Sequence, residues 1–512
     1  MTEWKTVSYG HSLASGSMII FLGLVLGAGL SYVLRIVLAR SLPVDEVGLF
    51  FSVLSFIIFV TLFQKIGTEL SLVRYIALWK VHQEEWKIKS ALVFTSLFQL
   101  VLALVYGGLI LLLAQYLETH YFHHPLAAEI LVPLSSLLVL LLLEDMPRRL
   151  FQGLNKMFWF SFLEWFKSLL VLVFVVIGFL WFEKTIIVPT MAFLLATLII
   201  GIVGIIVALR TTTFWKAPLK IDVPLLKDFF LFGLPLIFFV IGNKVIDSMD
   251  LLILTYFRPL EEVGVYSVVL PTAGLCLFFF RPLAVVMLSL GTELWRKGDL
   301  DQLRRLLSRV YDYLLLLVFP FIVLMMIYAE FLLTLLFGPA YASGATALRI
   351  ILPGVFFFGA VHMNISVLTA VGNSKASGKI MFYGAIVNCL LNIILIPFFG
   401  MVGAAVATLV CYFVTFWLSW IYLHQENVHL DKKNFKFYLL LFLSLLLFVP
   451  VYFVQPLIST SVVSFLIICT VSFLSYIILI NRLGFFSLTE MKELWVMIKS
   501  SLFSSRPVKE DN

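Results

Sequence analysis

About fourteen apolar runs, each long enough to cross a bilayer, dominate this 512-residue sequence and restrict what it can fold into. Hydrophobic residues make up 62% of the chain and charged residues only 13%, roughly half of the ~25% charge typical of soluble domains. A membrane-spanning chain with this composition satisfies its backbone hydrogen bonds within helices. The sequence therefore predicts an all-α polytopic membrane protein. Little of the chain remains for a soluble domain, which excludes most enzyme folds.

The predicted spans alternate with short charged segments. They cover residues 17–39, 47–64, 90–114, 129–143, 158–181, 186–209, 230–255, 263–290, 313–336, 346–370, 380–397, 401–423, 437–454 and 458–480. The first run contains Arg35 and lacks a small-residue cleavage site, so we interpret it as a retained helix rather than a signal peptide. Residues 298–310 carry leucines on one face and arginines on others, and predict a separate interfacial amphipathic helix.

Most of the 36 lysines and arginines fall in the connections on one side of the predicted spans. Because an even number of spans returns the chain to its starting side, both termini lie on that side. The positive-inside rule makes it the cytoplasm. We expect a multi-pass protein of the cell (plasma) membrane with both termini cytoplasmic. The basic residues are spread over successive loops, as topology alone requires, so we expect no nucleic-acid partner.

An internal repeat divides the chain. Residues 43–54, PVDEVGLFFSVL, align with residues 259–270, PLEEVGVYSVVL, and half of the aligned positions are identical. The offset carries the first span onto the seventh, so the repeated unit has six helices in the same orientation, related by a pseudo-twofold axis along the membrane normal. The prediction is an N-terminal six-helix lobe, a C-terminal six-helix lobe, an extra transmembrane hairpin and a cytoplasmic tail, over residues 1–215, 216–430, 431–481 and 482–512.

Ionisable residues inside spans each cost about 2.5–3.5 kcal/mol at the bilayer centre, so those present must pair, snorkel or line a wet cavity. Glu164 and Lys167 are three residues apart on one helix face and predict a buried pair. Lys244 and Asp247 have the same spacing, so an alternative interpretation is that these two charges neutralise each other as well.

A polar cluster in the seventh span is the strongest candidate for a transport site. Asn243, Lys244, Asp247 and Asp250 lie at the depth where transporters usually bind substrate. Cationic side chains facing a cavity suit a diphosphate, because phosphate oxygens accept charge-assisted hydrogen bonds. The candidate substrate-binding residues are Arg35, Asn243, Lys244, Arg281 and Arg349, with snorkelling to the membrane surface as the alternative for the arginines.

Other motifs give weaker indications of a functional site. Asn364, Asn388 and Asn392 could bind sugar hydroxyls, but helix packing is the favoured role. The four cysteines and the cluster His120, His123 and His124 lack metal-ligand spacing, so we expect no metal site. Nucleotide-binding and hydrolase motifs are missing too, and we expect no catalytic residue, no cofactor and no enzyme activity.

Four stretches resemble the polysaccharide (O-antigen type) flippases of the multidrug/oligosaccharidyl-lipid/polysaccharide exporter superfamily. They are LRIVLARSLPVDEVGLF at 34–50, FGLPL followed by DLLIL and EEVGVY within 232–266, GTELWRKGDLDQLRRLL at 291–307, and IPFFGMVGAAVAT at 396–408. The resemblance implies a two-lobed fold, a central cationic cavity and alternating access. It also implies export of a polyprenyl-diphosphate-linked oligosaccharide from the cytoplasmic to the outer leaflet.

The resemblance further implies ion coupling, and we assign it to Asp247 or Asp250 with Na⁺ or H⁺ as the coupling ion. Expected partners are the lipid-linked oligosaccharide, membrane lipids, and a glycan polymerase or glycosyltransferases. Two alternatives within the superfamily are a lipid II flippase and a cation-coupled multidrug exporter. The first is disfavoured because Arg35 is the one arginine in the early helices, and the second because Arg281, Arg349 and the extra hairpin are atypical for it.

Overall fold

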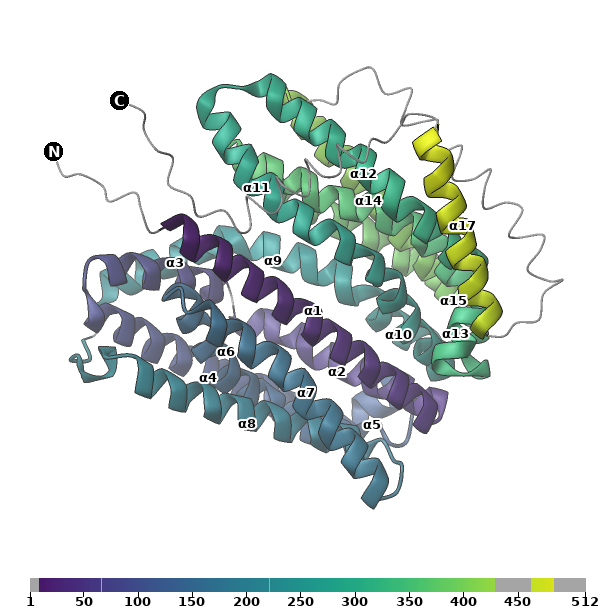
Figure 1. Ribbon diagram of the computed structural model, residues 1–512. Helices are drawn as coiled ribbons and strands as arrows, with labels where there is room; N and C mark the ends of the chain where they lie inside the picture. Colours follow the sequence, from purple (N-terminus) through teal and green to yellow (C-terminus); the bar gives the residue numbers. More distant parts are fainter. Residues whose placement is uncertain (1–8, 66, 221, 429–461, 483–512) are drawn as a thin grey trace. The chain divides into compact units, whose positions relative to one another are not determined.

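The structure, a computed structural model, describes residues 9–65, 67–220, 222–428 and 462–482. These residues form helices and connecting turns, and no β-strand occurs among them (Figure 1). Ten helical segments in this part of the chain are long and apolar enough to cross a membrane. The all-α polytopic fold predicted from the sequence is confirmed.

The chain divides into two compact units. The N-terminal unit comprises Gly16–Val268 and Met381–Ala404, and the C-terminal unit comprises the remainder. The unit boundaries fall inside α1 (Tyr9–Ser41), α10 (Leu260–Gly274) and α15 (Ser374–Gln425). The lobe boundary predicted at residue 215 stays a prediction.

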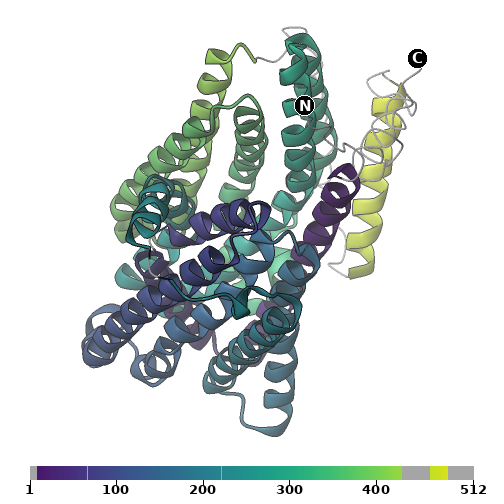
Figure 2. The same ribbon diagram turned by 90° about the vertical axis from the view of Figure 1, so that its left-hand side faces the viewer.

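The N-terminal unit is a bundle in which α6 and α7 both pack along α8 (Figures 1 and 2). Its helices are α2 (Val44–Lys65), α3 (Thr68–Val81), α4 (Glu85–Leu117), α5 (Ala127–Ser135), α6 (Leu137–Gly153), α7 (Met157–Trp181), α8 (Ile187–Thr211) and α9 (Val223–Phe257), with the short η1 (Glu118–Phe122) and η2 (Phe214–Lys216). A buried apolar cluster from α3, α4, α6, α7 and α8 forms a core that includes Phe151 and Leu163.

In the C-terminal unit α11 and α12 pack against α14. The elements are η3 (Leu275–Phe279), α11 (Phe280–Lys297), α12 (Leu300–Ile327), α13 (Ala329–Phe337), η4 (Pro339–Gly344), α14 (Ala345–Ala370) and α17 (Val462–Arg482). Tyr476 of α17 is fully buried in a cluster with Leu316, Val323 and Tyr328.

Two predictions for the C-terminal half have clear outcomes. The prediction of a separate interfacial helix at 298–310 was wrong, because residues 300–310 begin the continuous helix α12, and Leu303 and Leu307 of their apolar face are fully buried. The predicted spans 380–397 and 401–423 form α15, which breaks at Gly400, where φ is 55°. The predicted span 437–454 lies outside the described residues.

The two copies of the sequence repeat contact each other directly within the N-terminal unit. A Cβ on Gly48 of α2 would clash with the Leu260 carbonyl oxygen, and a Cβ on Gly264 of α10 would clash with the Val44 carbonyl oxygen. Val44 corresponds to Leu260, and Gly48 to Gly264, so each copy offers the same atoms to the other. A reciprocal contact of this kind is what a two-fold relation between repeated segments requires.

The acidic residue of each copy binds the start of another helix. Glu262 accepts a hydrogen bond of 2.7 Å from the backbone N–H of Met401, just after the break in α15, and a second of 2.8 Å from Arg258. Its counterpart Glu46 accepts from the backbone of Ile186, where α8 begins. Each carboxylate therefore satisfies a backbone donor that a helix start leaves unpaired.

Replacing Gly48 with alanine tests the crossing of α2 and α10. Alanine normally favours a helix over glycine by about 1 kcal/mol. At Gly48 its methyl group must push two backbones apart, so we expect a net destabilisation of roughly 1–3 kcal/mol, measured as a lower thermal unfolding midpoint in detergent. The control is Gly108→Ala in α4, where nothing lies within 4 Å of the added Cβ. An equal or higher midpoint for Gly48→Ala than for the control would contradict the close crossing.

Candidate functional site

A buried carboxylate in a cage of hydrogen-bond donors from other helices is the most distinctive polar feature of the N-terminal unit. Asp250 of α9 is fully buried. Its Oδ2 accepts a hydrogen bond of 2.8 Å from the Tyr266 hydroxyl of α10. Its Oδ1 accepts from the side-chain amides of Asn388 and Asn392 of α15, at 3.0 and 2.6 Å. Three helices thus converge on one carboxylate.

The cage can rearrange without moving a helix. Asn388 and Asn392 are fully buried, one turn apart, and linked by a hydrogen bond of 3.1 Å. The Oδ1 of Asn392 is buried without a hydrogen-bond partner. A 180° turn of this amide exchanges its nitrogen for its oxygen at nearly the same shape. The same side chains can therefore present either N–H donors to a carboxylate or oxygen atoms to a cation.

The other predicted residues of α9 lie outside this cage. Lys244 is half-buried and within electrostatic reach of Asp247 and of Lys65 in α2. Asp247 is exposed, and Asn243 is half-buried. Of the two predicted ion-coupling residues, the structure places only Asp250 among buried polar side chains of other helices.

Within the N-terminal unit, Arg35 of α1 contacts both repeated segments, 43–54 and 259–270. Its guanidinium donates a hydrogen bond of 2.7 Å to the Ser267 carbonyl oxygen of α10 and lies 4.0 Å from the ring centre of Phe51. These contacts fasten α1 to α2 and α10. A role of Arg35 in substrate binding stays a prediction.

Arg281 and Arg349 belong to the C-terminal unit. Arg281 is exposed, at the start of α11, and lies within electrostatic reach of His362. Arg349 of α14 donates a hydrogen bond of 3.1 Å to the Met326 carbonyl oxygen near the end of α12. Asn364, in the same unit, accepts from Tyr311 and donates to Ser419, which fits the helix-packing role favoured from the sequence.

Glu164 and Lys167 of α7 are paired, but with α6 rather than with each other. Glu164 binds Arg148 at 3.0 Å, and Lys167 binds Glu144 at 2.6 Å. Both partners are on α6, which was predicted to end at residue 143. The pairing predicted from the sequence considered only one helix, and the structure satisfies each charge across two.

These pairs extend into a network of four cations and four carboxylates that joins α2, α3, α6 and α7. Its members are Lys65, Glu69, Glu144, Asp145, Arg148, Arg149, Glu164 and Lys167. Lys65 binds Glu69 at 2.6 Å and Asp145 at 2.5 Å, while Arg149 binds Glu69 at 2.6 Å. Equal numbers of opposite charges make this a structural framework. The acids and arginines of α6 stand four residues apart in the sequence, a signal that could have indicated them.

No group of three or more His, Cys, Asp and Glu side chains that could hold a metal ion occurs among the residues whose structure is described. Any ion at Asp250 would therefore depend on amide and hydroxyl oxygens as well as on the single carboxylate.

Comparison with known families identifies the chain. The family model described as "Polysaccharide biosynthesis protein" matches residues 13–288, more than half of the sequence and including the helices of the N-terminal unit up to α10. The chain belongs to the polysaccharide biosynthesis protein family. A second family model, MatE, matches residues 235–394. The resemblance stated from the sequence is confirmed, and the protein is a flippase-type transporter of that superfamily.

Two relatives and one solved structure illustrate what this chain is similar to. It is 27% identical to the uncharacterized membrane protein MJ1068 of Methanocaldococcus jannaschii, over 95% of this chain and 99% of the relative. It is 27% identical to the probable low-salt glycan biosynthesis flippase Agl15 of Haloferax volcanii over 33% of this chain and 36% of that protein. The solved structure of the lipid II flippase MurJ, in an inward closed conformation, superposes with a TM-score of 0.72 at 16% identity, covering 91% of this chain and 99% of MurJ.

The ion network of this flippase-type protein makes a quantitative prediction. Asp145→Asn leaves Lys65 with one carboxylate in a buried site, so we expect a loss of about 3–5 kcal/mol of stability. The control is Glu293→Gln in the exposed pair with Lys297, which should cost less than about 1 kcal/mol. Thermal unfolding of both variants in detergent measures the difference. Equal midpoints would show that the network contributes no more than a surface pair.

Proposed function

We propose that this protein carries a polyprenyl-diphosphate-linked oligosaccharide from the cytoplasmic to the outer leaflet by alternating access, driven by Na⁺ or H⁺ at Asp250. Family membership supports the transport class, and the caged carboxylate of Asp250 is the observation that carries the coupling mechanism. The protein catalyses no covalent reaction on its cargo. Its role is the export step in the synthesis of a cell-surface polysaccharide or glycoconjugate.

The chemistry of the cage favours a small cation. The Asp250 carboxylate is fully buried and accepts hydrogen bonds from the Tyr266 hydroxyl and from two asparagine amides, and burying a charge is costly. A proton on the carboxylate removes the charge. A Na⁺ ion balances it and takes oxygen ligands from Asp250, the Tyr266 hydroxyl and the turned amide of Asn392, because hard cations prefer oxygen.

Ion binding at this cage can bias the conformation of the helices that build it. Asp250, Tyr266 and Asn392 come from α9, α10 and α15, so an ion changes the contacts among three helices at once. A ligand shifts a conformational equilibrium only by its difference in affinity for the two states. The ion and the lipid-linked oligosaccharide each supply such a difference.

The diphosphate is recognised by cations. Lys244 is the leading contact, because it is a half-buried cation on the same helix as Asp250. Asn243 and Arg35 in the N-terminal unit, and Arg281 and Arg349 in the C-terminal unit, are the further proposed contacts. The membrane is the plasma membrane, the termini are cytoplasmic, and enzymes that build or polymerise the glycan are the proposed partners.

Leaflet transfer in proteoliposomes tests the proposed cargo. A polyprenyl-diphosphate oligosaccharide with a fluorescent sugar should reach the outer leaflet faster than in protein-free vesicles, measured by dithionite quenching. Lys244→Gln removes a charge-assisted contact and should slow transfer roughly 10–100-fold. The matched control is Lys375→Gln, an exposed lysine of the C-terminal unit.

Transfer no faster than in protein-free vesicles would reject the proposal. Lipid II transported in preference to other oligosaccharide carriers would favour the lipid II alternative, and efflux of cationic drugs without any glycan lipid would favour the multidrug alternative.

Asp250→Asn tests the coupling ion. The substitution keeps the shape of the side chain and removes its charge, so we expect transfer that no longer responds to an imposed Na⁺ or pH gradient. The control is Asp301→Asn, whose side chain is 73% exposed. The gradient that drives the unmodified protein identifies the ion. A gradient response that survives Asp250→Asn and disappears in Asp247→Asn would move the coupling site to Asp247.

A further inference from the structure

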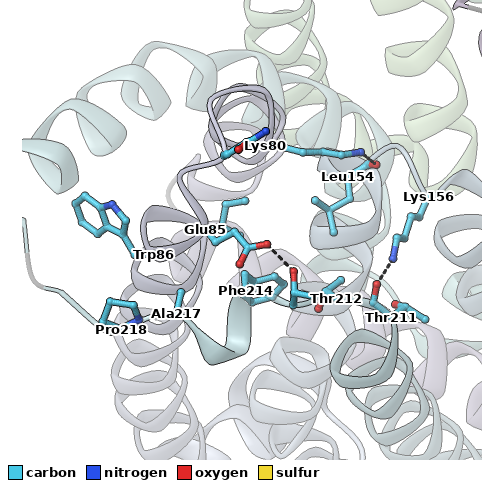
Figure 3. Close-up of a pocket in the computed structure, with 13 residues that line it drawn as sticks. Lys80, Glu85, Trp86, Leu154, Lys156, Thr211, Thr212, Phe214, Ala217 and Pro218 are labelled. Atoms are coloured by element: carbon cyan, nitrogen blue, oxygen red, sulfur yellow. Dashed lines mark hydrogen bonds between the residues drawn. The ribbon is translucent and has the colours of Figure 1, made fainter.

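A pocket of about 640 Å³ lies in the N-terminal unit, where the ends of α3, α4, α6 and α8 meet η2 (Figure 3). The lysine-rich connections around it fall on the side of the membrane that the charge distribution assigns to the cytoplasm. None of its lining residues takes part in the Asp250 cage or the ion network. Its lining residues are Lys80, Gln83, Glu85, Trp86, Ile88, Leu154, Lys156, Thr211, Thr212, Thr213, Phe214, Ala217 and Pro218.

Two lysines of the pocket are held by neutral groups. The Lys80 ammonium donates a hydrogen bond of 2.8 Å to the Leu154 carbonyl oxygen, and the Lys156 ammonium donates one of 2.5 Å to the Thr211 carbonyl oxygen. Among the described residues neither lysine forms an ion pair within 4.0 Å. Burial and the nearby charge of Lys80 lower the pKa of Lys156. Two cations that repel each other beside an open pocket favour an anionic ligand.

The one acid of the lining forms a hydrogen bond with another lining residue. The Glu85 carboxylate accepts a hydrogen bond of 2.5 Å from the Thr213 hydroxyl. Figure 3 shows the two lysine side chains on the opposite side of the pocket from Trp86. A further cation, Lys220, lies 5.5 Å from the ring centre of Trp86. The surroundings of the pocket are therefore positive.

An apolar groove of about 370 Å³ lies one helical turn deeper on the same helices. On α4, Ile88 lines the pocket and Leu92 lines the groove. At the end of α6, Leu154 lines the pocket and Leu150 lines the groove. Residues four apart share a helix face, so pocket and groove are adjacent. The neighbouring η2 residues contribute to both, Phe214 to the pocket and Trp215 to the groove.

We propose that the pocket and the groove together bind one phospholipid of the surrounding membrane that has an anionic headgroup. Lys80 and Lys156 bind the headgroup phosphate, the Trp86 indole N–H completes the polar end, and an acyl chain fills the groove between α4, α6 and α8. Charge complementarity selects the headgroup, and the apolar lining selects a lipid over a soluble phosphate.

Lipid binding to the purified full-length protein in detergent tests the site. Native mass spectrometry and thermal unfolding are followed during titration with dioleoylphosphatidylglycerol, with dioleoylphosphatidylcholine, and with inorganic phosphate. We expect one phosphatidylglycerol to bind with an affinity at least about 10-fold above that of phosphatidylcholine, which has the same chains and no net charge. Inorganic phosphate alone should give no shift of the unfolding midpoint.

Variants separate the two ends of the site. The double variant K80Q/K156Q should lose the preference for phosphatidylglycerol, while K80R/K156R should keep it. Ser96→Phe, which fills the groove, should weaken binding of both lipids. The matched control is the double variant K375Q/K379Q, which removes the same charge from exposed lysines of α15.

Three results would overturn the proposal. Equal affinity for the two lipids would show that the lysines do not recognise a headgroup. Phosphate binding as tight as that of the lipid would identify a soluble-anion site. An equal loss of the preference for phosphatidylglycerol in K375Q/K379Q would show that the preference comes from general surface charge and not from this pocket.

Discussion

The reciprocal contact between Gly48 and Gly264 is the constraint on which the rest of the N-terminal unit depends. Because both glycines lack a Cβ, the starts of α2 and α10 approach backbone to backbone. That approach places the paired acids, Glu46 and Glu262, where each can bind the start of another helix. It also places Tyr266, half a turn beyond Gly264, against Asp250. A close crossing of two repeated helices thus positions the candidate coupling site.

Charged side chains in this unit serve two different purposes. The network around Lys65 and Asp145 balances every cation with a carboxylate, and such balanced pairs hold α2, α3, α6 and α7 together. Asp250 is fully buried and accepts hydrogen bonds from amide and hydroxyl groups. The ion pairs of the network balance their own charges, whereas the groups around Asp250 also carry oxygen atoms that a cation can bind. This contrast is the physical basis for assigning coupling to Asp250.

Sequence reasoning succeeded where a feature is local or periodic. The apolar runs predicted the helical membrane fold, and the repeat at 43–54 and 259–270 identified the two segments that contact each other. It failed where a partner comes from a distant helix. Glu164 and Lys167 were paired with each other because their partners on α6 are invisible in a local pattern. The helix-packing role of Asn392 was predicted, but nothing in the sequence identifies Asp250 as its partner. The amphipathic face of 298–310 looked like a membrane surface helix because burial by protein and by lipid leaves the same pattern.

The central claim is that ion binding at Asp250 and binding of the lipid-linked oligosaccharide are coupled in one transporter, and thermodynamic linkage tests it most directly. Coupling between two sites is reciprocal, so the ion must change the affinity for the cargo. The measurement is the equilibrium dissociation constant of a polyprenyl-diphosphate oligosaccharide across a series of Na⁺ concentrations and pH values, for the unmodified protein and for Asp250→Asn. The account predicts a change of roughly 5–150-fold with one of the two ions, absent in the variant. An affinity that is independent of both ions, or a dependence that persists without the Asp250 carboxylate, would contradict it.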